Sequence, residues 1–127
     1  MKIFGIGIDL ANINRIEKSL KNKNFKKRIF DISEITKCNN HINKANCFAK
    51  RFAAKEAFGK ALGTGISNGI NFNEITVHNI KSGKPKIKLL GKTKKIVNKI
   101  IKKSKFSIFL SLSDDKPFAV ATVVISS

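Results

Sequence analysis

The sequence predicts an α+β domain in which a mainly antiparallel sheet packs against a long central helix. Three observations support this fold class. Residues 45–62 are rich in alanine, lysine and phenylalanine, which are compatible with helix, and Gly63 follows them in the usual position of a helix end. Apolar, β-branched runs lie near both ends of the chain. Turns at 82–85 and 114–117 join the later runs as hairpins, and strands joined by tight turns pair antiparallel.

The first part of the chain predicts one strand and several short helices. Residues 3–10 are apolar and β-branched, so we expect a buried strand that ends at Asp9. Gly5 and Gly7 in this strand are expected to let a ligand approach the backbone closely. Asn12 can cap a following helix whose isoleucines lie on one face. The elements expected next are a helical turn over 25–30, a short helix from Ser33, and a polar loop over 38–44.

The second half of the chain predicts the remaining strands and one amphipathic helix. That helix is expected to turn Ile96, Ile100 and Ile101 inward. The expected elements in order are a half-exposed strand over 72–78, a returning strand over 86–90, the helix over 92–103, and a hairpin of strands 106–112 and 118–125. At 127 residues the chain suits a single domain over 1–127.

Charge is the strongest compositional signal. Lysine and arginine total 26 against 8 aspartates and glutamates, a formal charge of +18. Such a field favours polyanionic partners, including nucleic acid, anionic membranes, nucleotide-like substrates and acidic proteins. Lysine, asparagine and isoleucine also have A/T-rich codons, so genomic base composition is an alternative source of the excess. A functional inference must therefore depend on where particular charges lie.

The cysteines and the chain start bear on the cellular compartment. Cys38 and Cys47 have no metal-ligand spacing and do not indicate a secreted disulfide scaffold, and Cys47 is expected in the core. The first residues are too short an apolar run, and too soon charged, for a signal peptide. No apolar run is long enough to span a membrane. We expect a soluble, cytoplasmic protein.

Asp9 and Glu56 are the candidate catalytic and metal-binding carboxylates. Magnesium takes oxygen ligands, commonly one or two carboxylates together with phosphate oxygens and water. Each residue also has an ordinary structural explanation. Asp9 could cap the next helix, and Glu56 could form a surface ion pair with Lys60, four residues further along the helix.

A phosphate-binding segment follows the carboxylate on the central helix. The glycines of Gly63-Thr64-Gly65 expose backbone amides, Thr64 supplies a hydroxyl group, and Lys60 supplies a positive charge. The spacing is not that of the nucleotide P-loop. These features alone indicate a phosphorylated ligand and do not identify it.

Two longer segments carry a specific resemblance. The first is Gly5-Ile6-Gly7-Ile8-Asp9, followed by Arg15. The second runs from Phe48 through Arg51-Phe52-Ala53-Ala54-Lys55-Glu56-Ala57 to Gly63-Thr64-Gly65-Ile66. The turn Gly83-Lys84-Pro85 and the closing strand over 119–125 also fit. Together, and in order over essentially the whole chain, they resemble holo-acyl-carrier-protein synthase, the short type of 4'-phosphopantetheinyl transferase.

The resemblance implies an activity and a set of residues. The enzyme would transfer the phosphopantetheine group of coenzyme A to a serine of apo-acyl carrier protein and release adenosine 3',5'-bisphosphate, a step that supports fatty acid biosynthesis. Asp9 and Glu56 would hold Mg²⁺, and Glu56 is the candidate base, directly or through water. Lys60 would contact a phosphate of coenzyme A, while Gly63-Thr64-Gly65 and the turn residues Lys84 and Pro85 would line its site.

The resemblance also implies partners. Family members are typically trimers with the active site at the subunit boundary. The acidic carrier protein would meet a basic surface around one apolar side chain, and charge there would chiefly set the association rate and specificity. The residues expected on this surface are Arg15, Lys18, Lys21, Lys23, Phe25 and Arg28. No nucleic acid and no membrane insertion are implied.

One departure and two alternatives remain. Many relatives carry a histidine in a Ser-x-Ser-His-like segment before the final turn, where this chain has Leu110-Ser111-Leu112-Ser113-Asp114. We place Ser113 at the position of that histidine and interpret it as a turn residue or a phosphate contact. The first alternative is a basic nucleic-acid-binding protein that uses the lysines of residues 92–103; it lacks a motif and an aromatic stacking platform. The second is an inactive member of the same family, which retention of both carboxylates and Lys60 disfavours.

Overall fold

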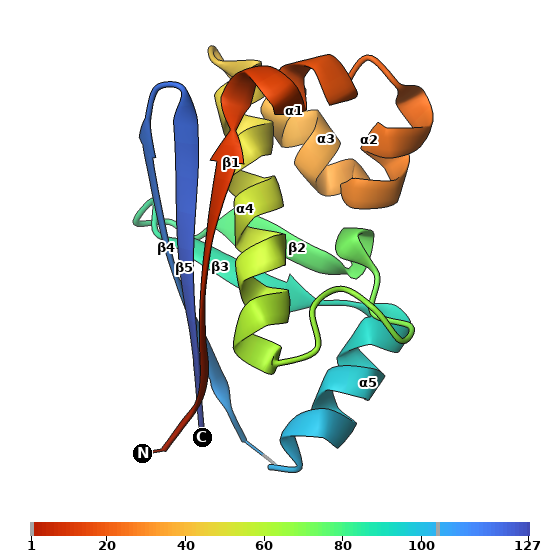
Figure 1. Ribbon diagram of the computed structural model, residues 1–127, viewed down its shortest axis with the longest axis vertical. Helices are drawn as coiled ribbons and strands as arrows, with labels where there is room; N and C mark the ends of the chain where they lie inside the picture. The colour runs from red at the N-terminus through yellow and green to blue at the C-terminus, as the bar shows by residue number, and fades with distance from the viewer. Residues whose placement is uncertain (1, 104) are drawn as a thin grey trace.

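Figure 1 shows the computed structural model of the protein, which describes residues 2–103 and 105–127. Its elements in chain order are β1 (Ile3–Asn12), α1 (Ile13–Ser19), α2 (Lys23–Ile29), α3 (Ile32–Asn39), α4 (Lys44–Leu62), the 3-10 turn η1 (Phe72–Glu74), β2 (Ile75–Asn79), β3 (Pro85–Leu89), α5 (Gly91–Ile101), β4 (Ser107–Asp115) and β5 (Phe118–Ser126).

The strands form two antiparallel sheets. The larger sheet has the order β1–β5–β4, and α4 packs along its inner face. Strands β2 and β3 form a separate hairpin, with β3 beside β4. Helices α1 to α3 gather at one end of the molecule and α5 lies at the other (Figure 1). The predicted class, antiparallel strands packed against a long central helix, is confirmed.

Two glycines of β1 allow the strand to lie directly against α4. A Cβ atom added at Gly7 would collide with the carbonyl oxygen of Ala57, and one added at Gly5 would collide with that of Ala61. A side chain at either position would force the strand away from the helix. We expected these glycines to admit a ligand, and that interpretation is wrong because the space beside them is filled by the helix backbone.

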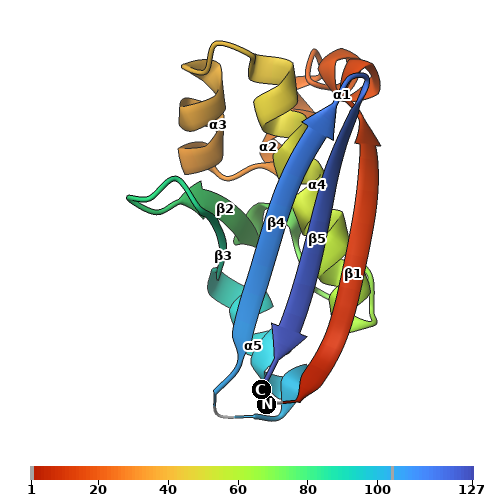
Figure 2. The ribbon, with the colours of Figure 1, turned by 90° about the vertical axis from the view of Figure 1, so that its left-hand side faces the viewer.

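Strand β1 differs in two ways from the predicted buried strand. It continues through Asp9 to Asn12. Its outward side chains Ile6, Ile8 and Leu10 are 64%, 61% and 58% exposed. Because they pair in register with two valines and a threonine of β5, the outer face of the sheet is largely apolar. Figure 2 shows that face with no element of the described chain over it.

The predicted start of α1 and the predicted end of α4 are confirmed. Asn12 caps α1 and accepts a hydrogen bond from the backbone of Arg15 at 3.1 Å. Gly63 ends α4 with φ of 90°, a conformation that glycine adopts without cost. Helix α3 starts one residue before Ser33, because Asp31 caps it in a capping box with Glu34.

The two cysteines join α3 to α4. Cys38 is fully buried in the last turn of α3, so the polar loop expected over 38–44 begins later than predicted. Cys47 is 4% exposed, which confirms its placement in the core. The two residues form a disulfide. The sequence did not indicate this pairing, since their proximity results from the packing of one helix on another.

A buried ion pair joins α3, α4 and the start of β2. The ammonium of Lys55 lies 2.7 Å from a carboxylate oxygen of Glu34, and neither side chain is exposed. The ammonium also donates to the carbonyls of Phe72 and Ile75, at 2.8 and 2.6 Å, while Glu34 accepts from the backbone of Val77. Burial lowers the pKa of Lys55, and Glu34 opposes that change. These contacts fix how α4 is rotated and therefore where its other charged residues point.

The later elements follow the predicted order with shifted bounds. The strand expected over 72–78 begins as η1 and becomes a strand at Ile75. In α5 the most buried apolar residue is Val97, whereas Ile96 and Ile100 are half-buried. No helix within the described residues is both long and apolar enough to cross a membrane.

Candidate active site

Asp9 and Lys60 meet where β1 crosses the last turns of α4. The ammonium of Lys60 lies 3.1 Å from a carboxylate oxygen of Asp9 and donates to the carbonyl of Ile8 at 3.0 Å. The Lys60 side chain is 54% exposed and that of Asp9 is 16% exposed. The ion pair that the helical spacing favoured, between Lys60 and Glu56, is replaced by a pair with the strand.

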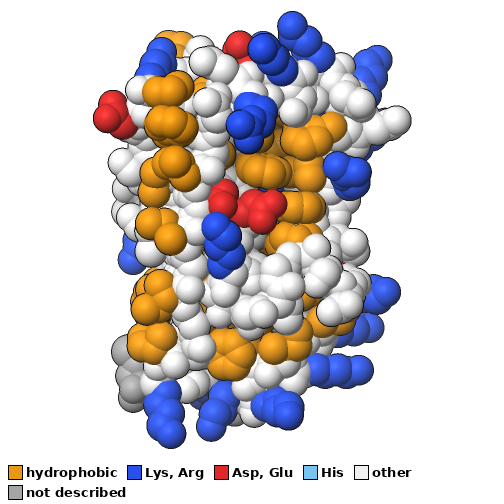
Figure 3. Space-filling model, in the orientation of Figure 1, with side chains coloured by type: hydrophobic (Ala, Val, Ile, Leu, Met, Phe, Trp, Pro, Cys, Tyr) orange, Lys and Arg blue, Asp and Glu red, His pale blue; other side chains and the backbone are white. Residues whose placement is uncertain are grey.

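Glu56 completes a group of three charges, which we call the carboxylate cluster: Asp9, Glu56 and Lys60. The pKa of Glu56 is raised, first because the half-buried carboxyl loses solvation and then because Asp9 repels its charge; Lys60 opposes both effects. Figure 3 shows acidic side chains with a basic one beside them in the middle of this face. Two carboxylates and one cation therefore share a small, partly desolvated area.

The arrangement of charges in the carboxylate cluster suits a hard divalent cation. Asp9 repels the charge of Glu56, and a bound cation would relieve that repulsion. No group of three or more histidines, cysteines or acids that could hold a metal lies within residues 2–103 and 105–127. Asp9 and Glu56 could supply two oxygen ligands, so the remaining positions would belong to water or substrate phosphate, as is usual for Mg²⁺.

The Gly63-Thr64-Gly65 loop folds back onto α4. The amide of Gly65 donates to the carbonyl of Gly59 at 3.0 Å, and the hydroxyl of Thr64 donates to the carbonyl of Gly65 at 2.8 Å. The hydroxyl of Ser67 in turn donates to the carbonyl of Thr64. The loop therefore starts one turn after Lys60 and has a defined internal hydrogen-bond pattern. Its role in ligand binding stays a prediction.

The residues predicted to meet a carrier protein lie on the helices at one end. Arg15 on α1, Lys21 before α2 and Arg28 on α2 are exposed. Phe25 is half-buried, with its ring 6.4 Å from that of Phe52. Phe52 stacks at 5.9 Å on the ring of Phe72, and Arg28 borders a groove of about 440 Å³ that Phe72 also lines. Of these cations, Arg28 therefore lies beside an aromatic cluster whose member Phe52 is one helical turn from Glu56.

Lys84 and Pro85 are not brought to the carboxylate cluster. They lie at the start of β3, which packs beside β4, whereas Asp9 lies on β1. Strands β1 and β4 are the two opposite edges of the sheet, as Figure 2 shows. Both residues line a cavity of about 310 Å³ together with β4. Within one chain, the predicted site is divided between the two sheet edges.

A second cavity, which the sequence did not indicate, lies beside Pro85. It has a volume of about 430 Å³ and is bordered by α3, α4 and the β2–β3 hairpin. We call it the basic cleft, and its defining residues are Lys37, His41, Lys50, Arg51, Asn79 and Pro85. The available signal was the pair at positions 50 and 51, which follows Cys47 by three and four residues and so lies on one face of the helix.

Arg51 is the unusual member of the basic cleft. It is 5% exposed, and none of the ion pairs among the described residues includes it. Its guanidinium donates to Asn79 at 3.3 Å and to the sulfur and carbonyl of Cys47 at 3.3 and 3.4 Å. Within the described chain its Nε has no hydrogen-bond partner. A buried cation with unused donors is suited to an anionic ligand.

The segment that departs from the family pattern lies at the rim of this cleft. Ser113 belongs to β4 and pairs with Val120, so the turn interpretation is wrong. Counted along Ser-x-Ser-His, the fourth position of Ser111-Leu112-Ser113-Asp114 is Asp114, which corrects the placement of Ser113 at the histidine position. Asp114 lies 2.8 Å from the ammonium of Lys50 and accepts from Asn46 at 2.8 Å. Hydrogen bonds from Lys50 and Asn46 lower its pKa.

Fold and site together define an α+β protein with a carboxylate cluster at one sheet edge and the basic cleft at the other. A family model described as the 4'-phosphopantetheinyl transferase superfamily matches residues 5–123. The chain therefore belongs to this superfamily.

Individual relatives agree over their full length. The chain is 53% identical over 125 residues to a holo-[acyl-carrier-protein] synthase of Pelagibacter ubique, covering 98% of each chain. It is 43% identical over 129 residues to that of Vibrio campbellii, covering 100% of each. Among solved structures, the holo-[acyl-carrier-protein] synthase of Neisseria meningitidis superposes with a TM-score of 0.87 at 34% identity, covering 99% of this chain and 100% of that one. A synthase of Bacillus anthracis in complex with coenzyme A (3',5'-ADP) gives 0.80 at 38% identity, covering 98% and 97%.

Proposed function

We propose that this chain is a holo-acyl-carrier-protein synthase, with one catalytic domain over the whole chain. It transfers the 4'-phosphopantetheine group of coenzyme A to a serine of apo-acyl carrier protein and releases adenosine 3',5'-bisphosphate, in support of fatty acid biosynthesis. The observation that carries the proposal is the carboxylate cluster, in which Asp9, Glu56 and Lys60 come together from two segments distant in sequence. The names of the full-length relatives support it.

The reaction makes one phosphorus–oxygen bond and breaks another. The serine oxygen attacks the phosphorus that carries pantetheine, and the bond from that phosphorus to the bridging oxygen breaks. The bridging oxygen leaves on adenosine 3',5'-bisphosphate. Glu56 is the candidate base for the serine proton, directly or through a metal-bound water. Lys60, held by Asp9, faces the negative charge that develops on the phosphate oxygens.

Mg²⁺ is the proposed cofactor, with Asp9 and Glu56 as its protein ligands. When bound, the ion would neutralise negative charge on the pyrophosphate. The support is the pair of mutually repelling carboxylates, which leaves coordination positions for substrate oxygens.

The basic cleft is the proposed site for the nucleotide end of coenzyme A. That end carries several phosphate charges, and Lys37, Lys50 and Arg51 border the cleft together with Pro85. Its volume of about 430 Å³ lies toward the low end of ligand pockets, so it would hold part of the substrate. The Gly63-Thr64-Gly65 loop, next to Lys60, is proposed to line the path of the pantetheine phosphate.

A homotrimer with shared active sites is the proposed assembly. One chain carries the carboxylate cluster and the basic cleft at opposite edges of its sheet. If the sheet edge of one copy meets that of the next, the cluster of one and the cleft of the other complete a site. The apolar outer face with Ile6, Ile8 and Leu10 would then be covered by a neighbouring copy. The trimeric number follows the family resemblance, and a sizing measurement tests it.

The acidic carrier protein is proposed to dock on the exposed cations of α1 and α2. Arg15, Lys21 and Arg28 would meet its acidic residues, and Phe25 would meet an apolar one. This surface leads to Glu56 through Phe52, so a docked carrier could present its serine to the carboxylate cluster. The proposed location is the cytoplasm, where coenzyme A and the carrier protein are both available.

A mass measurement tests the activity. The protein is mixed with coenzyme A, Mg²⁺ and apo-acyl carrier protein, and the intact mass of the carrier is followed with time. A gain of one phosphopantetheine group is expected; no gain would reject the proposed function. Asp9→Ala and Glu56→Ala are measured in parallel, and unchanged rates in both variants would reject the metal assignment.

A further inference from the structure

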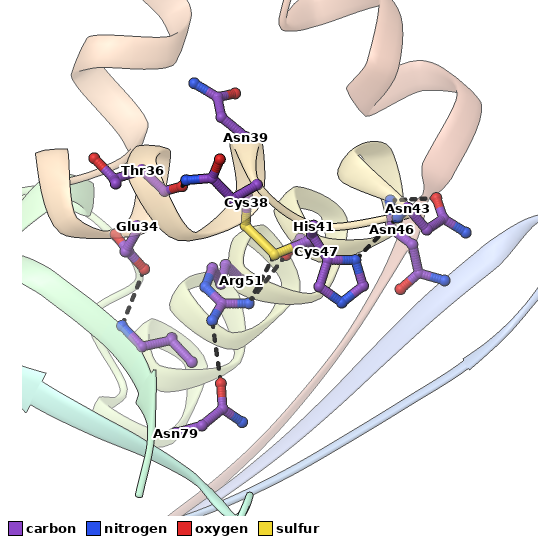
Figure 4. The surroundings of a disulfide bond; sticks show 12 residues. Glu34, Thr36, Cys38, Asn39, His41, Asn43, Asn46, Cys47, Arg51 and Asn79 are labelled. Carbon is purple, nitrogen blue, oxygen red and sulfur yellow. Dashed lines mark hydrogen bonds between the residues drawn. A yellow bond between two sulfur atoms is a disulfide. The ribbon is translucent and has the colours of Figure 1, made fainter.

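The disulfide between Cys38 and Cys47 forms part of the wall of the basic cleft. Cys47 borders the cleft, and its disulfide bond to Cys38 links α4 to α3. Figure 4 shows Arg51 directing its guanidinium toward Cys47 on one side and Asn79 on the other. Reduction of this disulfide therefore changes a group that contacts the buried guanidinium of Arg51.

Reduction would change the charge next to Arg51. The guanidinium lies 3.3 Å from the sulfur of Cys47. A disulfide sulfur carries no charge, so it leaves Arg51 available to an anionic ligand. A free thiol beside an arginine is favoured as thiolate, although burial opposes ionisation. A thiolate at this position would occupy the guanidinium and compete with a phosphate.

Reduction would also release a mechanical link. The disulfide ties the end of α3 to α4. Lys37 lies on that last turn of α3, and His41 follows it, with its ring accepting from the backbone of Asn43 at 3.0 Å. Both Lys37 and His41 border the cleft. Without the link, their positions relative to Arg51 depend on noncovalent packing alone.

We infer that the Cys38–Cys47 pair sets the affinity of the basic cleft for the nucleotide end of coenzyme A, with tight binding in the disulfide state and weak binding in the dithiol state. The inference rests on the proposed function, because it regulates the cleft assigned there. In the cytoplasm a disulfide of this kind is typically a redox-sensing one.

The redox step balances with a small dithiol reductant that enters the basic cleft, where Cys47 is 4% exposed. One thiolate of the reductant attacks the sulfur of Cys47, which borders the cleft, and Cys38 leaves as a thiolate. The second thiol of the reductant then attacks the mixed disulfide and releases Cys47. Two electrons pass to the protein, which gains two thiols, and the reductant becomes a disulfide.

Thermodynamic linkage gives a second consequence. A ligand that binds the disulfide state more tightly must stabilise that state against reduction by the same factor. Adenosine 3',5'-bisphosphate, the proposed product, carries the anionic groups in question and can serve as the probe. It should therefore make the disulfide harder to reduce.

Equilibrium binding of this probe tests the inference on the unmodified protein. Binding is measured by calorimetry in the oxidised protein and after reduction with a phosphine, with thiols counted by alkylation and mass spectrometry. We expect binding to weaken about 10-fold on reduction, within the usual range of coupling between sites. Equal affinity in the two states, or no disulfide after mild oxidation, would overturn the inference.

Two variants separate the charge effect from the mechanical one. Cys38→Ser keeps the Cys47 thiol beside Arg51, and Cys47→Ser removes it. Both should be insensitive to the reductant, and Cys38→Ser should bind the probe more weakly than Cys47→Ser. Equal probe affinity in both variants would reject the thiolate mechanism. The carrier-mass assay separates the two proposals: an active enzyme with redox-independent binding rejects only this inference, whereas an inactive one rejects the proposed function.

Discussion

Lys60 on α4 donates to Asp9 on β1 at 3.1 Å, although the two residues are separated by most of the first half of the chain. The contact ties the end of the central helix to the sheet edge. It also couples the charge of Glu56 to both residues, because Asp9 raises and Lys60 lowers the pKa of that carboxyl. The charges of the carboxylate cluster are therefore coupled. Asp9 and Lys60 shift the pKa of Glu56 in opposite directions, so replacing one or the other should have different effects.

Removing the positive charge of Lys60 should change both the rate of the transfer reaction and its dependence on pH. Lys60→Met is expected to lower kcat/KM about 10²–10³-fold, as is typical when one donor to a developing negative charge is lost. Because Lys60 lowers the pKa of Glu56, the acidic limb of the pH–rate profile should move to higher pH. The exposed Lys95 on α5 provides the control Lys95→Met, which should leave the profile unchanged. A rate loss without movement of that limb would contradict the coupling.

Glu56 should be costly to stability in its ionised form. Its pKa is raised in the folded protein, so folding favours the protonated carboxyl, and stability falls as the pH rises through that pKa. Glu56→Gln is therefore expected to raise Tm near pH 8 and to have little effect near pH 4. The same variant should lose about 10²–10⁴-fold in kcat if Glu56 is the base.

Thermal unfolding at the two pH values checks this expectation. The exposed Glu17 of α1 supplies the matched control Glu17→Gln. A Tm of Glu56→Gln below that of the wild type at pH 8 would show that the carboxylate makes favourable contacts instead.

Variants in the two halves of the proposed site should complement each other. Asp9→Ala damages only the carboxylate cluster, and Arg51→Ala damages only the basic cleft. Each pure variant is expected to be inactive. If every site combines the cluster of one copy with the cleft of a neighbour, randomly mixed oligomers restore about one quarter of the sites in a cyclic assembly.

The measurement is transferase activity after the two variants are unfolded together and refolded. Mixing them without exchange of subunits is the control and should restore nothing. Absence of recovery in mixed oligomers, verified by mass spectrometry to contain both chains, would show that one chain supplies both halves.

Local sequence signals predicted the elements well where the contacts that determine them are local. The central helix was expected over 45–62 and spans Lys44–Leu62, because composition and a glycine end define it without tertiary help. The choice of Asp9 and Glu56 came from motifs rather than spacing. Helical spacing alone would have paired Lys60 with Glu56. Only the path of β1 shows why Lys60 pairs with Asp9 instead.

Features that depend on packing between distant segments could not be predicted. The collision between a Cβ at Gly7 and Ala57 arises only where β1 contacts α4. From the sequence alone, Gly7 was therefore wrongly interpreted as a position that lets a ligand approach the backbone. The exposure of Ile8 has the same origin, since an apolar strand looks identical whether its second face is buried by its own chain or not. The basic cleft requires α3, α4 and a hairpin to meet.

Electrostatic docking of the carrier protein should depend on salt. Arg15→Glu is expected to raise KM for the carrier about 10-fold at low ionic strength and only about 2-fold at 0.5 M salt, because exposed charges are screened. The value of kcat should change little, since Arg15 is on α1 and outside the carboxylate cluster. Steady-state kinetics at several salt concentrations provide the measurement, with Lys95→Glu on α5 as a charge-matched control. A salt-independent effect would argue against electrostatic docking.

The close contact between β1 and α4 should make Gly7 intolerant of any side chain. In Gly7→Ala the new methyl group would meet the backbone of Ala57, which cannot move without displacing the helix that carries Glu56 and Lys60. We expect a loss of about 3 kcal/mol in the free energy of unfolding, measured in urea. Gly83→Ala is the comparison: nothing lies within 4 Å of its added Cβ, so only its φ of +89° is unfavourable, at about 1–2 kcal/mol. If both variants lost the same amount, backbone conformation rather than helix–strand contact would explain the glycine at position 7.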